Sequence, residues 1–225
     1  MLKRSMDVLF SALGLILLSP LLLLITFLIK ATSEGPVFYR GRRAGRYGHP
    51  FSIYKFRTMV INADKIGGSS TSDDDPRITR VGKFLRKFKL DELPQLINVL
   101  KGEMSLVGPR PEVLQYVEMY TDEEKAILQI RPGMTDWASI WNSDEGAILA
   151  GADDPDRAYE ILIRPTKLRL QLDYAHYHPL WVDLKILLCT ALRILKIDWL
   201  PGEVARYGRL QPGAGRDLAL HAETK

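Results

Sequence analysis

Two adjacent carboxylates, Asp91 and Glu92, have the clearest capacity for chemistry in this chain of 225 residues. A carboxylate can attack phosphorus to give a mixed anhydride, from which the phosphoryl group is transferred onward. Carboxylates are also the usual protein ligands of Mg²⁺. A helix is expected to begin at this point, however, and acids at a helix N-terminus often serve only the macrodipole. The pair alone therefore leaves catalysis and helix stabilisation open.

Basic residues precede this pair and favour an anionic ligand. The stretches 35–63 and 76–90 contain lysine and arginine but no acid, and the chain carries a formal net charge of +4. Such a balance suits a phosphorylated ligand, an acidic membrane surface or nucleic acid. The cations at Arg86, Lys87 and Lys89 are expected to keep both acids ionised at neutral pH.

A single arginine, Arg110, is set between two prolines in Gly108-Pro109-Arg110-Pro111-Glu112. Proline stiffens the backbone on both sides, which suits a guanidinium that must be aimed. The planar fork of arginine donates two parallel hydrogen bonds to a phosphate. For the arginines of 40–46, a surface for lipid headgroups is the simpler interpretation. The sequence contains no G-x-x-x-x-G-K-[ST] phosphate loop and no strand-linked G-x-G-x-x-G.

The N-terminal run 8–29 is uncharged, and as a helix it would be about 33 Å long, enough to cross a bilayer. Ser19 and Pro20 fall near its middle, where proline removes a backbone donor and bends the helix. Basic residues flank both ends, so the positive-inside rule gives no orientation for a span. From the residues alone, a kinked span and a bent helix that enters and leaves by one leaflet are both open.

The remaining sequence predicts an α+β domain that faces a reducing compartment, since Cys189 is its sole cysteine. Segments 37–40 and 51–56 are β-like and flank a glycine-rich basic turn. The composition of 66–76 is typical of a mobile loop. Helices are expected from about residue 91, over 121–128 behind a capping box, over 165–177 and over 180–197. The last of these is either a core helix or a helix that lies in the headgroup plane.

Together these motifs resemble the bacterial sugar transferase family, the monotopic polyprenyl-phosphate phosphoglycosyl transferases, in its small single-domain type. The resemblance covers about residues 1 to 197, in the family's order. The matching segments are Ser19-Pro20, Lys55-Phe56-Arg57-Thr58-Met59, Arg80-Val81-Gly82-Lys83-Phe84-Leu85-Arg86, Leu90-Asp91-Glu92-Leu93-Pro94-Gln95-Leu96, Leu106-Val107-Gly108-Pro109-Arg110-Pro111, Arg131-Pro132-Gly133-Met134-Thr135 and Trp181-Val182-Asp183-Leu184-Lys185-Ile186-Leu187.

The resemblance implies an enzyme that moves a sugar 1-phosphate from a UDP-sugar to undecaprenyl phosphate and releases UMP. This is the first membrane step in making a glycoconjugate such as a capsule, exopolysaccharide, O-antigen or glycoprotein. Asp91 is then the nucleophile and forms a covalent aspartyl sugar-phosphate, and Glu92, with Asp91, is expected to hold Mg²⁺. The expected phosphate-binding residues are Lys55, Arg57, Arg86, Arg110, Arg131 and Thr135.

The resemblance also favours the re-entrant topology. It divides the chain into a re-entrant membrane helix over 1–30, broken at Ser19-Pro20, a cytosolic catalytic domain over 31–198 and a flexible tail over 199–225. The domain is expected to be mainly helical, with a small β-hairpin and interfacial amphipathic helices, on the cytoplasmic face of the bacterial inner membrane. The expected partners are a UDP-sugar, undecaprenyl phosphate and inner-membrane lipid, without nucleic acid; a homodimer is left open.

Two departures from the family's pattern concern the donor. Asp136 stands where the family has glycine, followed by Ser139-Ile140-Trp141-Asn142, and the stretch 143–159 is unlike the common pattern. These differences predict a changed sugar or nucleotide pocket with the phosphoryl chemistry kept. Two rival functions stay open. One is a membrane-anchored basic protein that binds acidic lipid or nucleic acid without catalysis, and the other is a glycosyltransferase that releases UDP.

Overall fold

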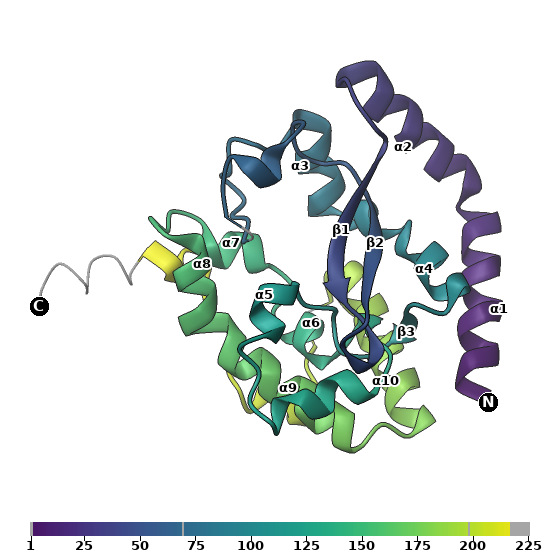
Figure 1. Ribbon diagram of the computed structural model, residues 1–225. Helices are drawn as coiled ribbons and strands as arrows, with labels where there is room; N and C mark the ends of the chain where they lie inside the picture. The colour runs from purple at the N-terminus through teal and green to yellow at the C-terminus, as the bar shows by residue number, and fades with distance from the viewer. Residues whose placement is uncertain (1, 69, 198, 217–225) are drawn as a thin grey trace, which may run out of the picture.

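Two N-terminal helices, α1 (Leu2–Leu17) and α2 (Ser19–Thr32), lie along one side of an α+β domain formed by the rest of the chain (Figure 1). The structure, a computed structural model, describes residues 2–68, 70–197 and 199–216, and Asp64 only by its backbone. The predicted combination of many helices with a small β-hairpin is confirmed. A second two-stranded sheet, which the sequence did not predict, accompanies it.

The elements of the domain are short, and most helices have fewer than three turns. The strands are β1 (Phe38–Ala44), β2 (Pro50–Phe56), β3 (Ser105–Val107) and β4 (Gly133–Thr135). The helices are α3 (Arg80–Lys87), α4 (Gln95–Lys101), α5 (Leu114–Val117), α6 (Trp137–Trp141), α7 (Glu145–Leu149), α8 (Pro155–Ala158), α9 (Arg164–His176), α10 (Leu180–Ile194) and α11 (Gly202–Ala205). Tighter 3-10 turns cover Arg46–Gly48, Ala63–Lys65, Leu90–Glu92 and Glu124–Gln129, and a π-helical turn covers Tyr159–Ile163.

The N-terminal pair is broken where Ser19 and Pro20 predict a break. The two helices are bent by 61°. Pro20 has no N–H, so the carbonyl of Ile16 lacks its usual helical donor. The Ser19 hydroxyl donates to that carbonyl over 2.8 Å, and the side chain thus replaces the missing backbone hydrogen bond.

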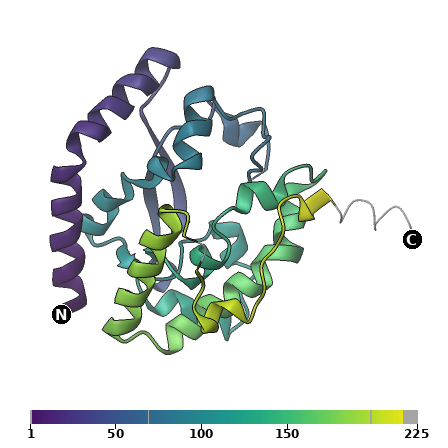
Figure 2. The same ribbon diagram turned by 180° about the vertical axis from the view of Figure 1, so that it is seen from behind.

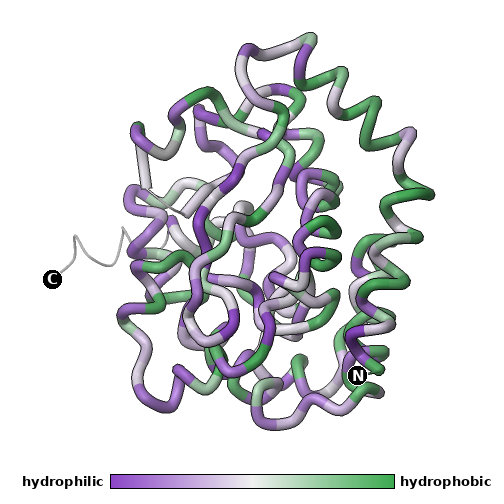
Figure 3. The backbone as a smooth tube through the Cα atoms, turned by 45° about the vertical axis from the view of Figure 1, so that its right-hand side comes forward, coloured by the Kyte–Doolittle hydropathy of each residue, from purple (hydrophilic) through white to green (hydrophobic). Residues whose placement is uncertain are grey.

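Apolar residues dominate both helices of the pair (Figure 3). In the described part of the chain, no single helix is long and apolar enough to cross a membrane, but α1 and α2 together pass the same test as a bent unit. Large apolar side chains stay exposed on both helices, among them Leu9, Phe10, Leu13, Ile16, Leu17, Leu23, Leu24 and Phe27.

Charged side chains attach the start of α1 to the domain. Lys3 forms an ion pair with Asp183 of α10, whose carboxylate is buried. Arg4 donates to the carbonyls of Val99 and Leu100, over 2.6 and 3.0 Å. These carbonyls belong to the last turn of α4, where a helix lacks donors of its own. The first turn of α1 is therefore fixed to two elements of the domain.

The far half of the pair is attached as well. Ile25 and Ile29 of α2 are buried in one apolar cluster with Phe56 of β2 and Leu85 of α3. Burial of each such side chain contributes on the order of 2 kcal/mol. Both halves of the bent pair thus pack on the same domain, α1 on α4 and α2 on α3 and the hairpin.

The antiparallel hairpin β1–β2 confirms the prediction from the two β-like segments, and it is longer than predicted. Its register runs from Phe38 opposite Phe56 to Ala44 opposite Pro50. The chain reverses at 45–49, where Tyr47 adopts a positive φ of 59°. Because the reversal needs so few residues, the first half of the predicted basic turn belongs to the strand.

The second sheet pairs two three-residue strands, β3 and β4, in parallel. A Cβ atom on Gly133 would lie 2.1 Å from the backbone nitrogen of Gly108, so the two chains can approach this closely only as glycines. Parallel pairing places the segments that follow β3 and β4 side by side. Arg110 and Asp136 are therefore neighbours.

Helix α10 confirms the prediction of a core helix, and its place in a headgroup plane stays a prediction. Val182, Ile186 and Cys189 are buried in the main core. Trp181 and Leu184, on the opposite face, are about half exposed, at 53% and 49%. The helix thus contributes to the core and also presents an apolar face outward.

The segment 199–216 lies along the back of the domain (Figure 2). Val204 of α11 is fully buried in the main core, and the Trp141 indole donates to the Gly208 carbonyl over 2.6 Å. This packing was not predicted, because the few apolar residues of the segment show no periodicity. The remainder of the predicted tail, 217–225, lies outside the described residues.

Candidate active site

Asp91 and Glu92 lie in the 3-10 turn Leu90–Glu92, between α3 and α4. Lys89, directly before the turn, has a positive φ of 55° and so redirects the chain after α3. The expected helix begins at Gln95 rather than near residue 91, because Pro94 occupies its N-cap position. The two acids consequently precede this helix and are held by the turn.

Glu92 is enclosed by two cations. Arg110 donates from Nη1 to Oε2 over 2.9 Å and from Nη2 to Oε1, a two-pronged contact. Lys55, from β2, donates to Oε1 over 2.9 Å. Burial works against ionisation of Glu92, but Arg110 and Lys55 outweigh it and hold the pKa of this carboxyl well below its usual range. The Glu92 carboxylate is therefore a firmly ionised group with both oxygens occupied.

Asp91 has the opposite surroundings. The residue is 6% exposed. Among the residues that the structure describes, none forms a hydrogen bond or an ion pair with its carboxylate. Burial, together with the neighbouring charge of Glu92, raises the pKa of Asp91, while Lys55, Arg86 and Lys89 act in the other direction. An unengaged carboxylate with a raised pKa is the more basic of the two and the better nucleophile.

Arg86 reaches the pair from the last turn of α3. Its Nε donates to the Thr58 hydroxyl over 3.0 Å, which fixes the guanidinium on the side of the β2 segment. Burial lowers the pKa of Arg86, and the charge of Asp91 opposes that shift. Helix α3 can sit this close because Gly82 faces Thr58, whose carbonyl oxygen would lie 2.0 Å from a Cβ at that position.

The structure brings some of the predicted phosphate-binding residues together and places others elsewhere. Lys55, Arg86 and Arg110 gather around the two acids. The other three have different contacts: Arg57 donates to the carbonyl and hydroxyl of Ser33, Arg131 donates to the Gly102 carbonyl, and Thr135 shares a hydrogen bond with Thr190. A role of Arg57, Arg131 and Thr135 in binding phosphate stays a prediction.

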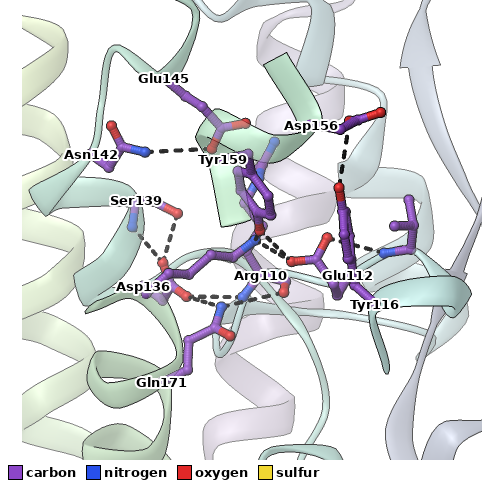
Figure 4. Close-up of polar contacts among 12 residues, drawn as sticks. Arg110, Glu112, Tyr116, Asp136, Ser139, Asn142, Glu145, Asp156, Tyr159 and Gln171 are labelled. Atoms are coloured by element: carbon purple, nitrogen blue, oxygen red, sulfur yellow. Dashed lines mark hydrogen bonds and ion pairs between the residues drawn. The ribbon is translucent and has the colours of Figure 1, made fainter. Parts of the chain in front are cut away.

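A buried ion pair that the sequence did not predict holds the end of the Arg110 segment, and its acid, Glu112, is labelled in Figure 4 beside Tyr159. Lys167 of α9 forms an ion pair with Glu112, and the Tyr159 hydroxyl donates to the same carboxylate over 2.7 Å. Burial opposes ionisation of Glu112, but Lys167 outweighs it and lowers the pKa of Glu112. Lys167 and Gln171 are one helical turn apart on the buried face of α9, and this spacing of polar residues was the available signal.

The carboxylates of Asp91 and Glu92 suit Mg²⁺ when phosphate oxygens of the substrate also coordinate the ion. Within the described part of the chain, no group of three His, Cys, Asp or Glu side chains is placed to hold a metal. Mg²⁺ typically uses one or two carboxylates and completes its shell with water and substrate phosphate oxygens. The unengaged Asp91 carboxylate provides one such ligand, and Oε2 of Glu92, which among the described residues accepts from Arg110 alone, keeps a lone pair for a second.

The family model of the bacterial sugar transferases matches residues 1–197, and the chain belongs to that family.

Several characterised relatives are similar to the chain. One is the UDP-N-acetylgalactosamine-undecaprenyl-phosphate N-acetylgalactosaminephosphotransferase of Aeromonas hydrophila, 39% identical over 198 residues, which cover 86% of this chain and 43% of the relative. Another is the exopolysaccharide production protein ExoY of Sinorhizobium fredii, 38% identical, with 84% of this chain and 83% of the relative covered. A third is the UDP-glucose:undecaprenyl-phosphate glucose-1-phosphate transferase of Caulobacter vibrioides, 39% identical, with 87% and 70% covered. The chain spans less than half the length of some of its relatives, 43%, 40% and 41% in three cases.

Proposed function

We propose that this protein transfers a sugar 1-phosphate from a UDP-sugar to undecaprenyl phosphate and releases UMP. The observation that carries the proposal is the contrast between the two acids. Glu92 is occupied by Arg110 and Lys55, whereas Asp91 is buried, unengaged and of raised pKa. Relatives named as UDP-sugar:undecaprenyl-phosphate transferases support the choice of substrates.

In the first step, a carboxylate oxygen of Asp91 attacks the β-phosphorus of the UDP-sugar. The bond from that phosphorus to the oxygen bridging to the α-phosphate breaks, and UMP leaves with the bonding electrons. The product is a sugar phosphate joined to Asp91 as a mixed anhydride. Arg86 and Arg110 are placed to stabilise charge on the phosphate oxygens, since both guanidinium groups lie beside the two acids.

In the second step, a phosphate oxygen of undecaprenyl phosphate attacks the phosphorus of the anhydride. The bond to Asp91 breaks and restores the carboxylate, and the product is a polyprenyl diphosphate sugar. No proton has to be moved in either step, because both attacking groups are anions. Mg²⁺, held by Asp91 and Glu92 with the donor phosphates, would neutralise charge on the phosphate oxygens.

The helix pair is proposed to be a re-entrant membrane helix, with the domain at the cytoplasmic face of the bacterial inner membrane. The attachment of both α1 and α2 to the same domain supports this topology. The exposed apolar side chains of both helices support contact with lipid, because soluble surfaces rarely expose such a continuous patch. The topology brings a soluble donor and a lipid-borne phosphate to one surface.

Covalent chemistry at Asp91 leaves a trace that metal binding does not. With UDP-sugar, Mg²⁺ and no lipid acceptor, the wild-type enzyme is expected to release up to one UMP per active site and to gain the mass of a sugar phosphate. Asp91→Asn keeps the shape but removes the attacking anion, so we expect no adduct and a loss of turnover of about a thousandfold or more. Glu92→Gln is expected to slow the burst, with the adduct still on Asp91. Rapid-quench measurement of UMP and peptide mass mapping check both.

Other outcomes would favour the rival functions. An adduct on Glu92, or full turnover by Asp91→Asn, would contradict the assignment. Product that forms only with both substrates present, without an adduct, would indicate direct transfer. Release of UDP in place of UMP would indicate a glycosyltransferase. A protein that binds acidic vesicles with steep salt dependence, and releases no nucleotide from any UDP-sugar, would be the basic binding protein.

A further inference from the structure

Asp136 lies at the centre of a buried polar network beside the Arg110 segment (Figure 4). The residue is 1% exposed. Its carboxylate accepts four hydrogen bonds, from the backbone N–H of Arg110, the side-chain amide of Gln171, and the backbone N–H and hydroxyl of Ser139, over 2.9, 2.8, 2.7 and 2.7 Å. A carboxylate so fully bonded in the interior is a rigid part of the structure.

The two oxygens of Asp136 have separate partners. Oδ1 accepts both hydrogen bonds from Ser139 and so caps the N-terminus of α6. Oδ2 accepts from Arg110 and Gln171, neither of which belongs to α6. A helix cap alone would need only Oδ1, so the contacts of Oδ2 point to a second role.

The position of the Arg110 N–H explains that role. The β3–β4 pairing continues past β3 as far as the Gly108 N–H, which donates to the Thr135 carbonyl over 3.1 Å. The ladder ends there, because the Pro109 carbonyl turns back and accepts from the Gly133 N–H over 2.9 Å. The next N–H along the chain, that of Arg110, donates to Oδ2 of Asp136 rather than to a strand carbonyl. The side chain of Arg110 then leaves this fixed point toward the Glu92 carboxylate.

We infer that Asp136 is a positioning residue for Arg110. It fixes the backbone from which the guanidinium reaches Glu92 and the donor's phosphates, and Gln171 donates both to Oδ2 of Asp136, over 2.8 Å, and to the Arg110 carbonyl, over 3.4 Å. The inference rests on the proposed function for the identity of the phosphates, but the attachment of Arg110 to Asp136 does not depend on it. A guanidinium displaced by about 1 Å would lose much of its two-pronged contact, because such contacts depend on geometry.

The first experiment measures the attachment without any activity. Hydrogen exchange at the Arg110 amide, followed by mass spectrometry of a peptide that covers 108–112, is expected to be at least about tenfold faster in Asp136→Ala than in wild type. Gln171→Leu, which removes one partner of Oδ2 together with the contact of Gln171 to the Arg110 carbonyl, is expected to raise the rate less. Asp154→Ala is the control, since Asp154 is also an aspartate that caps a helix, α8, and among the described residues its side chain has no hydrogen bond to the Arg110 segment. It is expected to leave exchange at 108–112 unchanged.

The second experiment asks whether Asp136 acts through Arg110. Binding of UDP, measured by calorimetry, is expected to weaken about tenfold in Asp136→Ala and several-fold in Gln171→Leu. Arg110→Met should weaken it at least as much. When Asp136→Ala is added to Arg110→Met, the affinity for UDP should fall by less than about twofold more, because the guanidinium that Asp136 positions is already absent. In turnover assays, the loss is expected in the KM for the UDP-sugar and in the UMP burst rate together.

Each other result decides against the inference. Unchanged exchange at 108–112 in Asp136→Ala would show that the contact does not hold the segment. Losses of UDP affinity that simply add in the double variant, or an equal loss in Asp154→Ala, would indicate a general structural role. If Asp136→Ala does not fold, Gln171→Leu takes its place. Hydrogen exchange at 108–112 and UDP affinity are then measured in Gln171→Leu alone and in combination with Arg110→Met. A wild-type protein that releases no UMP would overturn the proposed function, and the exchange and UDP measurements would still decide this inference.

Discussion

At the scale of single residues, the site consists of two neighbouring acids with different surroundings. The same turn exposes Glu92 to Lys55 and Arg110 and leaves Asp91 without a bonded partner. Residue types alone do not separate their roles, since either acid can hold a metal or attack phosphorus. The direction of the pKa shift separates them, because it is lowered in Glu92 and raised in Asp91.

The raised pKa of Asp91 predicts a pH dependence with a definite sign. Only the ionised carboxylate attacks, so the rate of the UMP burst should fall as the pH drops through the pKa of Asp91, which is raised above its usual value. Glu92→Gln removes a negative neighbour, so this acid limb should move to lower pH. Arg86→Met removes a positive neighbour and should move the limb to higher pH, by less than the Glu92→Gln shift. Burst rates measured from about pH 4 to about pH 8 check these shifts.

A control distinguishes these shifts from general effects of charge. Lys83 is an exposed cation on α3 and is not among the charges with the largest effects on the pKa of Asp91. Lys83→Met should leave the acid limb in place. Shifts of Glu92→Gln and Arg86→Met in the same direction would contradict the assignment of the limb to Asp91.

At the scale of elements, the predictable parts are those fixed by local sequence. The break of the N-terminal helix follows from one proline in an apolar run, and the Ser19 hydroxyl that compensates for it is its direct neighbour. The capping box of Thr121 and Glu124 forms as expected, with both of its reciprocal hydrogen bonds. Each of these features depends on residues within one or two turns.

The elements that sequence did not predict depend on contacts between distant segments. Helix α3 has few apolar residues and contains Gly82, which lowers its propensity, but that glycine lets it pack against Thr58. Strands β3 and β4 have three residues each, too few to show a period, and their pairing joins positions that are 28 residues apart, such as Ser105 and Gly133. The network of Asp136 follows from this pairing. Sequence therefore indicated Asp91, Glu92 and the cations Lys55, Arg86 and Arg110 around them, but not the hydrogen bonds of Asp136 and Lys167 that hold the Arg110 segment.

The break in the helix pair should matter more than its hydrophobicity. Ser19→Leu with Pro20→Ala restores the missing N–H donor and favours one straight helix over 2–32, about 46 Å long. A straight helix cannot keep both attachments, Arg4 on α4 and Ile25 in the cluster with α3. We expect the protein to stay in the membrane, the N-terminus to cross to the far side, and the UMP burst to fall about tenfold or more. Ser19→Ala alone, which keeps Pro20, is the control with the smaller effect. Unchanged topology and burst in the double variant would show that the break is incidental.

At the scale of the whole molecule, the apolar surfaces adjoin one another. Helix α3 contacts α2, and α10 is joined to α1 by the ion pair of Asp183 with Lys3. Large apolar side chains are exposed on both helices and at the C-cap of α3, namely Phe84, Phe88, Trp181, Leu184 and Leu188. Lysine and arginine side chains on the same helices can extend to lipid headgroups. We therefore expect α3 and α10 to lie at the membrane surface.

The attachment of α1 predicts on which side of the membrane the N-terminus lies. If the helix pair spanned the bilayer, Lys3 would be carried away from Asp183, and this buried side chain, 4% exposed, would lose the cation with which it is paired. That loss costs on the order of 3 kcal/mol, in addition to the contacts of Arg4. In a re-entrant arrangement both attachments persist, and both ends of the pair face the cytoplasm. Cysteines introduced at the exposed positions Leu2 and Glu34, with Cys189→Ala removing the buried native thiol, report the two ends.

In this experiment, Glu123→Cys, at an exposed position on the domain, provides the cytoplasmic reference. A membrane-impermeant maleimide should label all three positions in inverted vesicles and none in intact spheroplasts. Lys3→Met removes the ion pair with Asp183 and does not hinder α1 from crossing the membrane. The labelling pattern should nevertheless stay the same, because Arg4 and the cluster around Ile25 still hold α1 and α2 on the domain. Labelling of Leu2→Cys from the outer side, with Glu34→Cys labelled from the cytoplasmic side, would establish a span. The domain would then have to release the first turn of α1, and the packing of α1 on α4 described above would not exist in the membrane.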